Sequence, residues 1–97
     1  MTREQRYKTK QALWSYSALQ RLEDEESRNW CDAIRQTVDY YAEFDPLRAG
    51  ILQRRYFEHA TQEKTMELLC VGRTTFQKAQ LDLLSTLAVF AARKGLL

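Results

Sequence analysis

The sequence predicts an all-α fold, a small bundle of about five helices with a tight turn between two of them in its C-terminal half. Apolar residues recur at steps of three and four through most of the 97-residue chain, as they do on buried helix faces. Proline occurs once and glycine three times, which leaves few positions for turns. A hydrophobic content of 44% supports a globular core, and this length fits a single domain over residues 1–97.

Residues 1–45 are expected to form an N-terminal helical hairpin. Its first helix should run from about Thr2 to Arg21. The expected stripe of this helix consists of Tyr7, Gln11, Trp14, Ala18 and Leu22, widened by Leu13, Tyr16 and Leu19. The acidic run from Glu23 to Glu26 should lie at its end or in a turn, because acids at a helix C-terminus oppose the helix dipole.

The second helix of the hairpin is expected to begin with Ser27 or Asn29 as its cap. Its apolar stripe consists of Trp30, Ala33, Ile34, Thr37, Val38 and Tyr41. Trp14 and Trp30 are interpreted as core residues that join the two helices, since no convergent polar groups accompany them.

Residues 46–97 should begin with a third helix that ends near Glu58. Asp45 is a good N-cap, and Pro46 suits the first helical position, where its missing N–H is not needed. The expected inner face of this helix is Leu47, Ile51, Leu52 and Tyr56. Gly95 is the expected stop signal of the last helix, which should reach about Lys94.

The segment from Thr61 to Leu87 predicts two helices around a break at Cys70–Gly72. Thr61 can cap the first helix, on which Thr65, Leu68 and Leu69 share one face. The second helix should begin at Arg73. Its expected inner face is Phe76, Gln80, Leu83, Leu84 and Leu87, and a second apolar stripe is Leu81, Leu84, Ala88 and Ala91. A helix with two apolar stripes needs cover from the N-terminal hairpin or from a second subunit, and we favour a homodimer.

Polar side chains gather at the start of this last helix and predict a helix-turn-helix DNA reader. The residues expected to face outward are Arg73, Thr74, Gln77 and Lys78, with Thr75 as a backbone contact. Arg can bridge guanine O6 and N7, Gln can bridge adenine N6 and N7, and Thr and Lys can hold phosphates. The same pattern also fits a plain helical hairpin with a solvated polar face.

The stretch Thr61–Ala79 resembles the helix-turn-helix of sigma-factor region 4, whose pattern runs roughly S-Q-E-E-I-A-E-L-L-G-I-S-R-S-T-V-S-R-R. Identical positions are Gln62, Glu63, Glu67, Leu68, Leu69, Arg73 and Thr75. Leu52–Glu58 is similar to the family's L-R-x-R-Y-F-E helix end, and the likeness covers about Leu47 to Leu87. The short chain resembles the phage-encoded ArpU and RinA type transcription regulators. Two positions depart from the pattern: Cys70 replaces the turn glycine, and Gly72 replaces the cap serine.

The resemblance implies a phage-encoded, sequence-specific transcription regulator that reads double-stranded DNA. Arg54 and Arg55, near the end of the third helix, are expected to contact the DNA backbone or to serve the helix dipole and salt bridges. A different reading is a protein-interaction module that docks on RNA polymerase or another regulator, with the acidic stretch Glu23–Asp45 as its surface. The DNA-recognition subunit of a phage packaging machine uses the same motif.

Charge is unevenly distributed along the chain. Met1–Leu22 carries five basic residues and one acidic residue, whereas Glu23–Asp45 carries two basic and eight acidic residues. Residues 46–97 carry eight basic and four acidic residues. This pattern favours DNA binding by the C-terminal part. Pairing of the first two blocks with each other is the alternative for the N-terminal part.

Several classes of function are not expected. Cys31 and Cys70 lack metal-ligand spacing and should be separate thiols, and the lone His59 is interpreted as an ordinary loop residue, so we expect no metal or cofactor. No phosphate loop or nucleophile–base pair indicates an enzyme. The chain has no run of 18 apolar residues and no apolar signal stretch, and we expect a cytoplasmic protein without a membrane partner.

Overall fold

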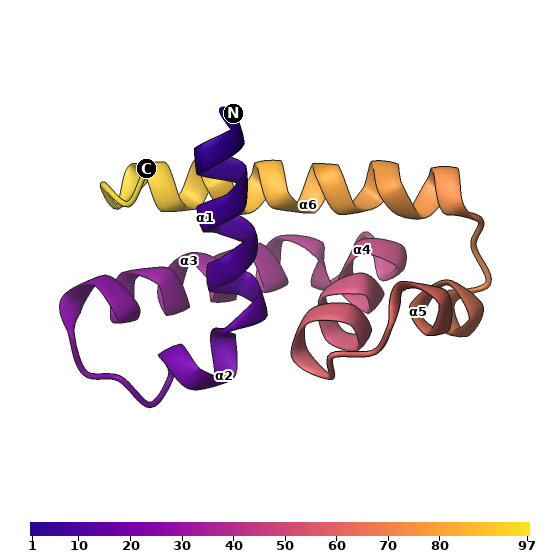
Figure 1. The fold of residues 1–97 in the computed structure, drawn as a ribbon, viewed down its shortest axis with the longest axis horizontal. Helices are drawn as coiled ribbons and strands as arrows, with labels where there is room; N and C mark the ends of the chain where they lie inside the picture. Colours follow the sequence, from indigo (N-terminus) through magenta and orange to yellow (C-terminus); the bar gives the residue numbers. More distant parts are fainter.

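The computed structural model describes all 97 residues as helices joined by short turns, with no strand (Figure 1). The helices are Arg3–Trp14 (α1), Tyr16–Leu19 (α2), Glu25–Ala42 (α3), Pro46–Ile51 (α4), Leu52–Phe57 (the π-helical segment η1), Gln62–Leu69 (α5) and Arg73–Arg93 (α6). The predicted all-α bundle is confirmed. The expected first helix is divided between α1 and α2, and the expected third helix is α4 continued by η1.

The longest helix, α6, is the element against which the others pack. In Figure 1, α1 crosses in front of the C-terminal half of α6, α3 lies along it, and α5 lies at its opposite end. One continuous cluster of buried apolar side chains joins these helices: Leu13, Trp30, Ala33, Ile34, Tyr41, Ile51, Leu52, Tyr56, Phe76, Ala79, Leu83, Leu84, Leu87, Ala91 and Leu96. The inner faces predicted for α3, for α4–η1 and for the first stripe of α6 lie in or against this core.

Side-chain caps fix where the helices begin. Asp45 accepts a hydrogen bond from the backbone N–H of Arg48 at 3.0 Å, and Pro46 occupies the first turn, as predicted. The cap of α3 was predicted wrongly, because Asp24 rather than Ser27 or Asn29 caps this helix. The run Glu23–Glu26 therefore begins a helix. Its acids favour the positive end of the α3 dipole, and the bond from Ser27 N–H lowers the pKa of Asp24.

The stripe predicted for the first helix is confirmed for half of its members: Leu13 lies in the core, and Trp14, Tyr16 and Leu19 pack against it. Tyr7 is 66% exposed, and Gln11, Ala18 and Leu22 also face solvent. Thr9 and Leu13 are the fully buried residues of α1. Thr9 escapes the cost of burying a free hydroxyl because its Oγ1 donates to the Gln5 carbonyl at 2.7 Å. The helix breaks at Ser15, and beyond the break Tyr16 and Leu19 still pack against the core while Ala18 and Leu22 do not.

Two further leucines lie outside the faces expected for them. Leu68 of α5 and Leu81 of α6 are 46% and 45% exposed, respectively. Both helices bury one narrow face, on Thr65 in α5 and on the Phe76–Leu87 stripe in α6. The second stripe of α6 is therefore buried only at Leu84 and Ala91, although both α1 and α3 pack against α6.

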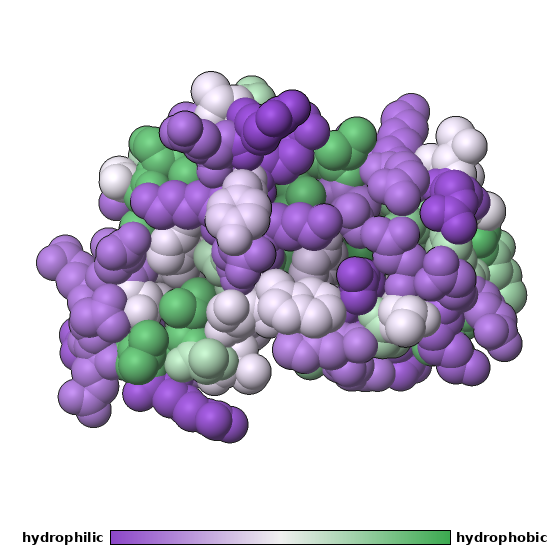
Figure 2. All heavy atoms as spheres, in the orientation of Figure 1, coloured by the Kyte–Doolittle hydropathy of each residue, from purple (hydrophilic) through white to green (hydrophobic).

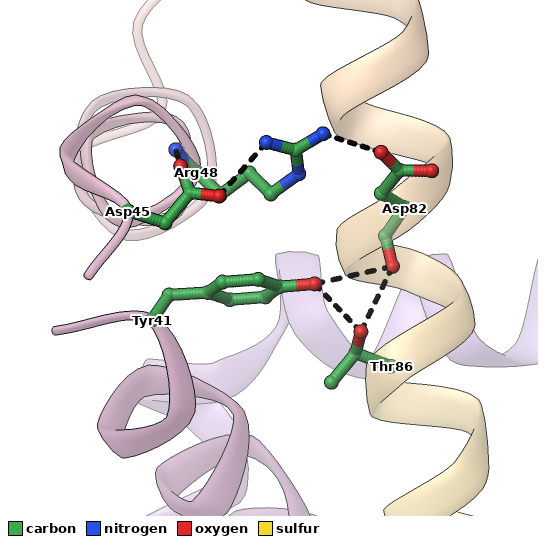
Figure 3. Close-up of polar contacts among 5 residues, drawn as sticks. All are labelled: Tyr41, Asp45, Arg48, Asp82 and Thr86. Atoms are coloured by element: carbon green, nitrogen blue, oxygen red, sulfur yellow. Dashed lines mark hydrogen bonds and ion pairs between the residues drawn. The ribbon is translucent and has the colours of Figure 1, made fainter.

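A polar network ties α3, α4 and α6 together (Figure 3). The Tyr41 hydroxyl lies 2.6 Å from Thr86 Oγ1, and Arg48 bridges Asp45 on its own helix and Asp82 on α6. Burial raises the pKa of Tyr41, and the bond to Asp82 raises the pKa of Arg48. Charge-assisted bonds of this kind are the stronger class of hydrogen bond, so they fix how α4 sits against α6.

None of the helices combines the length and the apolar character needed to cross a bilayer. Cys31 is buried and Cys70 is exposed, and neither forms a disulfide.

Candidate nucleic-acid interface

The turn between α5 and α6 is a Schellman motif. The N–H of Val71 donates to the Met66 carbonyl at 3.0 Å, and the N–H of Cys70 donates to the Glu67 carbonyl at 3.2 Å. Cys70 has φ 56° and ψ 45°, the left-handed conformation that glycine adopts without strain. Met66 and Val71 both pack against the core, which is the apolar contact that accompanies this motif. A cysteine therefore occupies the glycine position of a sharp, ordered turn.

The amino end of α6 is bare. Gly72 is its N-cap in an extended conformation, so no side chain caps the helix. The first bond within the helix runs from Phe76 N–H to the Gly72 carbonyl at 3.0 Å, and the N–H groups of residues 73–75 have no protein acceptor. Free N–H groups at a helix start favour an anion such as a phosphate. In Figure 1 this end lies far from α1 and α2.

The polar residues predicted to read DNA lie together at this end. Arg73, Thr74, Thr75 and Lys78 are exposed, and Gln77 is half-buried. Helical spacing places Arg73 with Gln77 on one row and Thr74 with Lys78 on the next row. Phe76 is fully buried and anchors the opposite side of the helix. Two adjacent rows of polar side chains thus project from a helix start that the core holds in place.

Helix α4 approaches α5 closely at Gly50. A Cβ atom on Gly50 would lie 2.7 Å from Leu69 Cδ2, closer than side-chain contacts allow. Thr61 caps α5 by accepting the N–H of Lys64 at 3.1 Å, as predicted. The position of α5, and through the turn that of α6, is therefore set by a cap at one end and a close helix contact at the other.

Arg54 and Arg55, expected either to contact the DNA backbone or to serve the helix dipole and salt bridges, both have partners within the protein. Arg54 forms an ion pair with Glu58 at 3.0 Å, and bonds from Gln53 and then Arg54 lower the pKa of Glu58. Arg55 donates to the Ala60 carbonyl at 2.8 Å. Arg54 is exposed and Arg55 is half-buried, so these bonds hold the loop before α5 and leave part of each guanidinium at the surface.

Sequence reasoning missed a structural role for His59. This residue has φ 59°, its Nε2 lies 2.9 Å from the Trp14 carbonyl, and its ring stacks on the Trp14 indole with centroids 4.0 Å apart. The Arg55 guanidinium lies 4.9 Å from the Trp14 ring centroid. These contacts, which we call the Trp14 cluster (Trp14, Arg55 and His59), tie α1 to the loop before α5. A histidine 45 residues from its partner gives no local signal.

The acidic stretch ends beside a groove between α3, α4 and α6. The groove has a volume of about 850 Å³ and includes Asp39, Tyr40, Phe44 and Ser85 in its lining. Phe44 is 86% exposed and Tyr40 is 60% exposed. Large apolar side chains grouped at the surface are typical of sites where proteins meet.

Comparison of the chain with protein-family models, curated proteins and solved structures gives no significant match.

Proposed function

We propose that this chain is a sequence-specific, DNA-binding transcription regulator of the phage-encoded, sigma region 4-like type. The single observation that supports this most is the bare amino end of α6, which carries exposed Arg73, Thr74 and Lys78 after an ordered turn. The amino end of a recognition helix is the part that contacts base edges in a major groove.

The rows on α6 suggest roles for each side chain. Arg73 and Gln77 have the donors and acceptors for guanine and adenine edges, respectively. Thr74 and Lys78 suit a thymine methyl or a phosphate, and Thr75, at the helix start, suits a phosphate. The free N–H groups of residues 73–75 add a second set of phosphate donors.

The test combines site selection with two substitutions. The protein would first be used to select bound duplexes from a random DNA library. Arg73→Ala and Gln77→Ala should then each weaken binding to the selected site by roughly 5- to 200-fold, the equivalent of about 1–3 kcal/mol per base contact. The matched control is Gln20→Ala with Arg21→Ala, which removes the same residue types from exposed positions after α2.

Full cognate affinity in the Arg73→Ala, Gln77→Ala double variant would show that the reading face is wrong. Far-UV circular dichroism of both pairs would check that the fold is intact, which we expect because Arg73, Gln20 and Arg21 are exposed and Gln77 is only half-buried.

The groove beside Phe44 favours a second candidate function, a protein-interaction module that docks on RNA polymerase or another regulator without reading bases. The two functions differ in their dependence on salt. DNA binding releases counterions from the duplex, so its affinity falls steeply as the salt concentration rises. A protein that fails to retard any duplex at low salt, yet loses a partner on Phe44→Ala, would support docking.

A further inference from the structure

The outer face of α1 is basic and aromatic. Arg3, Tyr7, Lys10 and Trp14 follow one another at steps of three and four, so they form one row, and Arg6 flanks it. Arg3, Arg6, Tyr7 and Lys10 are exposed. None of these three basic side chains takes part in an ion pair, so their charge is available to an outside partner.

Pairing with the acidic block does not account for this charge. The one ion pair that joins the two segments is Lys8 with Glu26, at 4.0 Å. Lys8 lies off the basic row and also donates to the Leu96 carbonyl at 3.1 Å, which fixes α1 to the end of the chain. The alternative that the basic and acidic blocks neutralise each other therefore applies to Lys8 alone.

The row of side chains on α1 continues onto Arg55 of η1, the segment that precedes the loop before α5. Lys10, Gln11, Trp14 and Arg55 line one shallow groove of about 180 Å³. The Arg55 guanidinium over the Trp14 ring joins α1 to η1 there. We name the basic strip as the set Arg3, Arg6, Tyr7, Lys10, Trp14 and Arg55. Figure 2 shows hydrophilic side chains over much of the face on which α1 lies.

The amino end of α1 lies beside the continuation of the reading face. Thr74, Lys78, Ser85, Ala88 and Ala92 share one face of α6 by their spacing. Met1, just before α1, and Gln5 of α1 line a groove with Ser85, Ala88 and Ala92. The distance along α6 from the reading residues to Ala88 is roughly 20 Å at 1.5 Å per residue.

We propose that the basic strip binds phosphates of the same DNA duplex outside the bases read by α6. At about 3.4 Å per base pair, 20 Å corresponds to roughly six base pairs. Arginine and lysine neutralise phosphates without reading sequence, and Tyr7 and Trp14 offer flat surfaces beside them. This inference rests on the proposed function, since it adds a second contact to the same complex.

The test compares two triple variants of equal charge. The strip variant, Arg3→Ala, Arg6→Ala, Lys10→Ala, removes the three basic side chains of the strip that form no ion pair. The control variant, Arg21→Ala, Arg28→Ala, Arg93→Ala, removes three exposed basic side chains elsewhere. Binding to the selected site would be titrated at several salt concentrations, on a duplex limited to the read bases and on one extended by about ten base pairs at each end, longer than the six base pairs estimated above.

We expect the wild type and the control to bind the extended duplex more tightly than the short one. The strip variant should lose this gain, and its slope of log affinity against log salt should fall by about 2.7 on the extended duplex. Its preference for the selected site over a scrambled one should stay the same. An unchanged slope, or an equal loss in the control, would overturn the strip as a contact.

Other outcomes separate the strip from the reader. If the wild type selects a site and the strip variant binds that site with the same affinity and salt slope, the strip is disproved and base reading is not. A wild type that binds every duplex equally, with the slope still lowered in the strip variant, disproves base reading alone. A wild type that binds no duplex at low salt disproves both.

Discussion

Replacing Cys70 with glycine should stabilise the protein. Cys70 sits at φ 56° in the glycine position of the Schellman turn. A left-handed conformation costs a residue with a Cβ atom roughly 1–2 kcal/mol, whereas glycine adopts it freely. Glycine loses more chain entropy on folding, roughly 0.5–1 kcal/mol. The Cys70 side chain is exposed and contributes little apolar burial, so the net gain should be about 1 kcal/mol.

Thermal and urea unfolding followed by far-UV circular dichroism, with a reducing agent present, would measure this gain. About 1 kcal/mol corresponds to a Tm increase of roughly 4–8 °C for a domain of this size. Cys70→Ala is the matched control, because alanine keeps the Cβ atom and the strain while it removes the thiol. If Cys70→Gly is no more stable than Cys70→Ala, the turn is not strained and the reasoning fails.

Three further predictions concern a buried hydroxyl, a helix cap and a contact between subunits. Burial raises the pKa of Tyr56 to about 12, and its hydroxyl lacks a partner. The wild type should therefore lose up to about 2.7 kcal/mol of stability as pH rises from 10 to 12, where the unfolded chain would release this proton more readily. Tyr56→Phe should remove that loss in alkaline unfolding curves and cost little at pH 7. Asp45→Ala should cost at least about 1 kcal/mol in urea unfolding, because it removes both the cap and the ion pair with Arg48, while Asp45→Asn should keep the cap and lose only the ion pair; an Asn variant as unstable as the Ala variant would contradict the capping role. Val89 of α6 is 51% exposed, so it could contact a second copy of the chain in the expected homodimer. Val89→Glu should then convert the dimer to a monomer in sedimentation analysis. A wild type that is monomeric at micromolar concentration would contradict the homodimer.

The helix boundaries that the sequence placed correctly are those with local chemistry. Asp45 with Pro46, Thr61 and Gly95, whose φ is +75°, each act through their own backbone neighbours, so their sequence context is sufficient. The start of α3 was missed because Asp24 lies within an acidic run, and the run was interpreted as the end of a helix.

What the sequence could not predict depends on contacts between distant segments. Tyr7 and Leu13 both fit a helical stripe, and only the position of α6 decides that Leu13 is buried while Tyr7 faces solvent. The polar residues at the start of α6 were placed correctly because they follow a recognisable turn, and their role in reading DNA stays a prediction. His59 was not, because its partner Trp14 lies on another helix.

The Trp14 cluster also means that residues 45–97 cannot be cut out as a small stand-alone domain. A fragment starting at Asp45 would lose the indole that His59 rests on, together with the Leu13 and Ile34 side chains that seal the long helix. Engineers who want a compact fragment of this chain would have to carry the first helices along or redesign the surface that their removal uncovers.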